Sequence, residues 1–172
     1  EIMSPEPSGI CFRADATNGA HHHLHAGVSI DGPFTSSQLL FRFPRWVPGS
    51  YFLREPIQHM FDLTATDQNG TELTWKRVGV DGLVVRLKKD STAVDIDYTL
   101  LAKEFSVRSN HLDTTHLHMM PPFTWFWPER GIDHDRLEGE HGVELTAPSS
   151  WTPATQLNLL SEEDANKAAK RW

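Results

Sequence analysis

Residues 10–105 are divided into short runs in which apolar and polar side chains alternate, and turn-forming residues separate the runs. Within residues 22–30, every second residue from Leu24 to Ile30 is apolar, and polar residues occupy most positions between them. Alternation with a period of two is typical of a β-strand that buries one face. This pattern limits the region to a fold built mainly from strands.

Two turn signals divide the runs. Asp31-Gly32 predicts a hairpin whose return strand is residues 39–43, and Asn69-Gly70 predicts a second hairpin. The remaining expected strands are residues 61–67, 72–78, 83–87 and 93–102. Short strands at roughly ten-residue spacing are expected of an all-β domain, here an antiparallel sandwich or saddle-like domain.

The alternation stops between residues 109 and 141. Residues 119–128 read Met-Met-Pro-Pro-Phe-Thr-Trp-Phe-Trp-Pro, which is too interrupted by proline for a central strand. We expect a long, ordered loop excursion that its aromatic side chains hold in place.

The end of the chain carries helix signals. Ser161 is a suitable N-cap, acidic residues follow it, and basic residues lie close to Trp172. The expected organisation is therefore a lead over residues 1–9, a β-rich domain over 10–160, and a short C-terminal helix over 161–172 that links to a further domain.

Length and charge narrow the function. The chain has 172 residues, which favours one domain, and 16 basic against 23 acidic residues give a net charge of −7. Without a long basic block, neither nucleic acid nor a membrane is an expected partner. No apolar run approaches the ~18 residues of a membrane span.

Cysteine usage and the N-terminus bear on location. The single cysteine, Cys11, excludes an internal disulfide and a Cys-x-x-Cys site. The first residues lack the layout of a signal peptide, which favours the cytoplasm, and a periplasmic location stays open if a signal peptide has been removed.

The sequence holds no complete hydrolytic motif. Neither His-Glu-x-x-His nor Gly-x-Ser-x-Gly occurs, so the chain is predicted to be inactive alone. The histidines offer an alternative, because imidazoles at alternate positions of a strand lie ~7 Å apart and can share one zinc. A stand-alone metal-binding β domain would use His21, His23, His25, His116 and His118.

The most distinctive segment is Pro44-Arg-Trp-Val-Pro-Gly-Ser-Tyr-Phe-Leu-Arg54. Together with Tyr98-Thr-Leu-Leu-Ala102, Ser106-Val-Arg108 and Ala147-Pro-Ser-Ser-Trp151, it resembles the N-terminal domain of the glycyl aminopeptidase family. The resemblance covers residues 10–160.

The resemblance implies a parent enzyme with an all-β N-terminal domain, a thermolysin-like catalytic domain that holds zinc, and a PDZ domain. The implied reaction removes N-terminal glycine or alanine from peptides. Neither the zinc ligands nor the general base maps onto this sequence, so the implied role is a non-catalytic scaffold and wall of the substrate cleft. The expected partner is the catalytic domain of the same protein, which residues 161–172 would join and through which peptide substrate would be met.

Certain side chains are candidates for the edge that faces the cleft. The guanidinium group of an arginine suits an ion pair with a carboxylate of the catalytic domain. The α-ammonium group of a substrate would need an acidic side chain. The candidates are Trp46, Tyr51, Arg54, Glu55, Glu104, Arg108 and Asp113. The alternative is that the two arginines form internal ion pairs that hold the loop.

Trp125, Phe126 and Trp127 suggest a last alternative, a carbohydrate-binding β-sandwich module in which sugar rings stack on exposed indoles. The neighbouring methionines and prolines favour instead a buried or interdomain plug.

Overall fold

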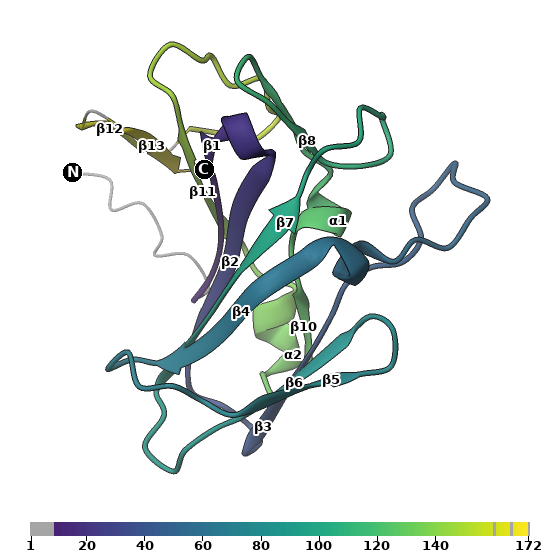
Figure 1. Ribbon diagram of the computed structural model, residues 1–172. Coiled ribbons are helices and arrows are strands. Elements are labelled where there is room, and N and C mark those ends of the chain that lie inside the picture. The colour runs from purple at the N-terminus through teal and green to yellow at the C-terminus, as the bar shows by residue number, and fades with distance from the viewer. Residues whose placement is uncertain (1–8, 160, 166, 172) are drawn as a thin grey trace.

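The computed structural model describes residues 9–159, 161–165 and 167–171, the last two segments by their backbone alone. Two sheets form the domain (Figure 1). The larger sheet has the order β12-β13-β11-β1-β2-β7-β4, with β1 (Ile10–Asn18), β2 (His23–Asp31), β4 (Met60–Asp67), β7 (Ala93–Leu101), β11 (Gly142–Ala147), β12 (Ser161–Ala165) and β13 (Lys167–Arg171).

The second sheet has the order β10-β3-β6-β5, with β3 (Gln38–Arg42), β5 (Trp75–Val78), β6 (Gly82–Arg86) and β10 (Trp127–Arg130). A small ribbon pairs β8 (His111–Leu112) with β9 (Leu117–His118). Short helical turns are η1 (Gly19–His21), η2 (Pro56–His59), α1 (Pro121–Thr124) and α2 (His134–Leu137). The all-β, sandwich-like prediction is confirmed.

The core forms from the alternating apolar residues. Leu24, Val28 and Ile30 of β2 are buried, and Leu39 and Phe41 of β3 belong to the same cluster from the second sheet. Both β2 and β3 thus bury the face that their period of two predicts.

The predicted strands exist, but both predicted hairpins pair differently. Strand β2 pairs with β1 and β7, whereas β3 pairs with β6 and β10 in the other sheet. After Asn69-Gly70 the chain turns back through a single bridge, Thr66 to Glu72, and then joins the second sheet as β5. A local turn signal predicts the reversal of the chain, but burial of the apolar face decides which sheet the next strand joins.

The predicted C-terminal helix is wrong. Residues 161–165 and 167–171 form β12 and β13, and β13 extends the larger sheet by pairing with β11. Glu162 lies opposite Lys170 in the register. The acidic and basic residues that were expected at the two ends of a helix therefore lie on two paired strands. Pairing with an existing sheet edge supplies the backbone hydrogen bonds that a helix would make, and it overrides local propensity. The predicted lead lies outside the described residues except for Gly9.

The aromatic excursion is ordered, as predicted. Phe126 is fully buried, and its ring centroid lies 4.2 Å from that of Phe43 and 5.3 Å from that of Tyr98. The Tyr98 hydroxyl donates to the Thr124 carbonyl at 2.8 Å, and burial raises the pKa of Tyr98. Strand β10 then lies at a sheet edge, where Pro128 is tolerated.

None of the helices within the described residues is long and apolar enough to span a membrane.

Candidate functional site

The loop between β3 and β4 projects from the body of the domain, at the right of Figure 1. Its base is closed by the Arg54 N–H, which donates to the Arg45 carbonyl at 2.7 Å, and by an ion pair of 3.4 Å between Arg45 and Glu55. Gly49 adopts a φ of 82°, and the Ser50 N–H donates to the Val47 carbonyl at 3.0 Å. This bonding fixes the shape of the loop.

The tip of this loop exposes large apolar side chains. Tyr51 is 96% exposed, and Phe52, Leu53 and Trp46 are also exposed. We call these four residues the aromatic tip. Contiguous exposed apolar side chains of this size typically mark a surface that another protein surface covers.

A second loop, between β7 and β8, lies beside the first (Figure 1). The Ser109 hydroxyl donates to the Glu104 carbonyl at 3.2 Å, and the Arg108 N–H donates to the Ser106 hydroxyl at 3.1 Å. Phe105 and Val107 are 79% and 78% exposed. The second loop therefore exposes apolar side chains as well.

A cleft of about 470 Å³ lies between the two loops. Four of the seven predicted residues line it: Arg54 and Glu55 from the first loop, and Glu104 and Arg108 from the second. The sequence separates these pairs by about fifty residues, so their convergence is a property of the fold. We call this cleft, with its four charged residues, the charged cleft.

The charged cleft contains an unsatisfied buried donor. The Arg54 Nε is buried and lacks a hydrogen-bond partner within the described part of the chain. The ion pairs found there leave out Arg54 and Arg108, and Arg45 instead holds the loop through Glu55. A buried donor without a partner is costly, so the Arg54 Nε is the strained polar atom of this cleft.

The other predicted residues lie elsewhere. Trp46 and Tyr51 are on the aromatic tip and not in the cleft wall, and Asp113 lies in the turn between β8 and β9. Hydrogen bonds from the Thr115 hydroxyl and from the N–H groups of Thr115 and His116 lower the pKa of Asp113.

The five predicted metal-ligand histidines do not converge. His21 lies in η1 and not on the strand face, and the His25 Nδ1 is 2.9 Å from the Thr99 hydroxyl. Among the described residues, the donors that lie within 4.8 Å of one another come from His111, Asp113 and His116. The sequence analysis missed His111 because it is not at alternate spacing with another histidine.

The aromatic excursion does not present a row of exposed indoles. Trp125 is 3% exposed, and its indole N–H donates to the Arg13 carbonyl at 2.6 Å. Trp127 is 37% exposed, and its ring lies 4.9 Å from that of Phe12. This packing supports the plug interpretation over the carbohydrate-binding one.

A family model, the peptidase M61 N-terminal domain, matches residues 12–170. The chain belongs to this family. Its match spans nearly the whole β-rich region, including β13. A search of the curated proteins gave no match.

Solved structures share the fold of the M61 domain. An aminopeptidase N family protein from Idiomarina loihiensis matches with a TM-score of 0.75 at 23% identity, over 95% of this chain and 27% of that one. An M1 zinc metallopeptidase from Deinococcus radiodurans matches with a TM-score of 0.50 at 12% identity, over 95% and 37%. A mutant of that metallopeptidase bound to a Tyr-Ser-Ala substrate gives 0.51 at 11% identity, over the same shares. The M61 domain thus spans between about a quarter and two fifths of the length of these proteins.

Proposed function

We propose that this M61 domain is the non-catalytic N-terminal part of a zinc aminopeptidase of the glycyl aminopeptidase type, whose parent carries a thermolysin-like catalytic domain and a PDZ domain. In this role it is a scaffold for the catalytic domain and one wall of the substrate cleft. The supporting observation is the convergence of Arg54, Glu55, Glu104 and Arg108 on one cleft beside an exposed apolar surface.

The chemistry of the charged cleft suits an edge between domains. Arg54 and Arg108 would each bind a carboxylate through a planar fork, from the catalytic domain or from the peptide. Glu55 and Glu104 are both exposed and would attract the α-ammonium group of a peptide substrate. The aromatic tip would supply the apolar contact that holds the two domains together.

Under this proposal, the catalytic domain binds the zinc ion. The sequence of this chain has no His-Glu-x-x-His, so the metal that activates water would be bound by residues outside it. Removal of N-terminal glycine and alanine is the activity that we assign to the parent enzyme.

The test measures hydrolysis of glycyl and alanyl p-nitroanilides. We expect the isolated M61 domain to be inactive and the full-length protein to be active. In the full-length protein, Arg108→Ala should lower kcat/KM roughly tenfold, about 1.4 kcal/mol, mainly through KM, because an interaction with the bound peptide or the cleft wall is lost.

Arg130→Ala is the matched control, since Arg130 is an exposed arginine on β10 that does not line the cleft. It should leave kcat/KM unchanged. Hydrolysis by the isolated domain would contradict the non-catalytic role, and equal effects of the two arginine variants would contradict the assignment of the charged cleft.

A further inference from the structure

We infer that His111, Asp113 and His116 form a binding site for a divalent transition-metal ion, with zinc as the natural candidate. The three side chains come from β8 and from the turn that follows it. One donor atom from each lies within 4.8 Å of the others. Two imidazole nitrogens and one carboxylate oxygen are a donor set that zinc accepts, with water in the fourth position.

His111 is oriented as a metal ligand. It is 7% exposed, and its Nδ1 lies 3.2 Å from the Lys103 carbonyl oxygen. A carbonyl can only accept a hydrogen bond, so Nδ1 carries the proton and the neutral ring has its lone pair on Nε2. A histidine that donates its other N–H to a backbone carbonyl is the usual support for a metal-bound imidazole.

That lone pair faces another acceptor. The His111 Nε2 lies 3.4 Å from Asp113 Oδ2. Two ligand atoms bound tetrahedrally to one zinc at ~2.0–2.1 Å are about 3.3 Å apart, so the observed separation fits a shared metal as well as a direct hydrogen bond. Without a cation, a proton on Nε2 would be needed to join the two groups.

Asp113 has one oxygen to spare. Its Oδ1 accepts from the Thr115 N–H and hydroxyl, both at 2.7 Å, and from the His116 N–H at 2.9 Å. These bonds fix the orientation of the carboxylate, so that Oδ2 points at His111. The turn itself is held by close packing, because a Cβ at Gly19 would lie 2.1 Å from the Asp113 carbonyl oxygen.

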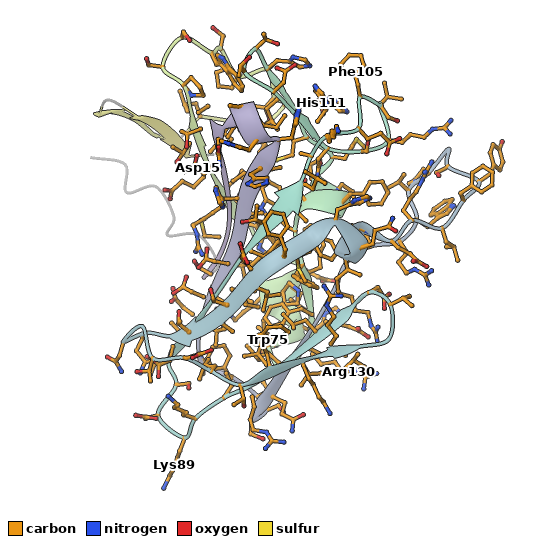
Figure 2. The ribbon with its side chains drawn as sticks, viewed as in Figure 1. Asp15, Trp75, Lys89, Phe105, His111 and Arg130 are labelled. Carbon is orange, nitrogen blue, oxygen red and sulfur yellow. The ribbon has the colours of Figure 1, made fainter. Side chains whose placement is uncertain are left out.

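His116 would complete the donor set, and its Nδ1 lies 3.4 Å from Asp113 Oδ1 and 3.0 Å from the Thr115 hydroxyl oxygen. Its side chain is 45% exposed, and its ring centroid lies 5.1 Å from that of His111. The Phe105 ring packs edge-on against both imidazoles, at 5.0 and 5.8 Å. Figure 2 shows Phe105 and His111 at the same end of the domain. A bound ion would therefore fix the β8–β9 turn beneath the Phe105 ring.

The test uses the 172-residue chain, stripped of metal with a chelator and titrated with Co²⁺ while visible absorption is recorded. We expect about one equivalent to bind, with the absorption of a Co²⁺ ion of low coordination number, and Zn²⁺ to displace it. His116→Ala should weaken binding roughly tenfold or more, and so should Asp113→Asn. His116 is exposed, so its variant tests the site without disturbing the core.

Two controls separate this site from other histidines. His134→Ala removes an exposed histidine on α2 and should leave Co²⁺ binding unchanged. The double variant His21→Ala/His23→Ala removes a second pair of imidazoles, whose ring centroids are 5.8 Å apart, and should also bind normally. Absence of Co²⁺ and Zn²⁺ binding, or binding that is lost only in the double variant, would overturn the inference. Binding by this isolated chain is independent of peptidase activity, so it can fail while the proposed function stands.

Discussion

Replacing Phe126 with alanine is expected to lower the free energy of unfolding by about 3–5 kcal/mol, the range for deleting a buried phenylalanine ring. Phe126 has no exposed surface and packs against the rings of Phe43 and Tyr98. The cavity would lie where the aromatic excursion is pinned to the core. Since small domains have about 5–15 kcal/mol of stability, this one change would remove a large part of it.

Urea unfolding followed by circular dichroism measures this loss. Phe52→Ala is the matched control, because Phe52 is 67% exposed and its truncation should change the free energy of unfolding by less than about 0.5 kcal/mol. If Phe126→Ala cost under about 1 kcal/mol, the excursion would not be part of the core and the plug interpretation would be wrong.

The second large effect, on kcat/KM, is expected when Tyr51→Asp and Phe52→Asp are combined in the full-length protein. If the aromatic tip packs on the catalytic domain, the two carboxylates would be buried without partners, and kcat/KM for glycyl p-nitroanilide should fall more than roughly tenfold. Tyr51 is 96% exposed in this chain, so the isolated domain should unfold at the same urea concentration as the unmodified one.

Lys89→Asp tests whether added negative charge alone has this effect. Lys89 lies at the end of the domain opposite Phe105 (Figure 2). Its variant should keep full activity. A tip variant as active as Lys89→Asp would mean that the tip is not in contact with the catalytic domain.

Much of the fold could be predicted from the sequence, since strand formation here follows from local alternation. The run that became β2 buries Leu24, Val28 and Ile30 as its pattern requires. The pairing of strands could not be predicted this way. The parallel pairing of β1 with β11 joins segments that are more than one hundred residues apart, and no turn signal reports it.

The C-terminal error has the same origin. Ser161 and the acidic residues after it are local signals, whereas the free edge of β11 that β13 occupies is a product of the whole fold. Local propensity therefore predicted a helix where two strands form.

The candidate site was predicted in part for a similar reason. Arg54 and Glu55 are adjacent in the sequence, and Glu104 and Arg108 are four residues apart. Each pair could therefore be recognised from the local sequence. Their shared cleft depends on the placement of two loops. His111 has no histidine at alternate spacing, and its contacts with Asp113 and the Lys103 carbonyl form only once the chain has folded.

Hydroxyl-radical footprinting, read by mass spectrometry, tests the central claim most directly by comparing the isolated M61 domain with the full-length protein. Tyr51, Phe52 and Phe105 should be oxidised readily in the isolated domain and become protected in the full-length protein, while Trp75 on β5 should react equally in both. Figure 2 places Trp75 well away from Phe105. Equal oxidation of Tyr51, Phe52 and Phe105 in the two proteins would contradict the account, because the surface beside the charged cleft would then face solvent and not a catalytic domain.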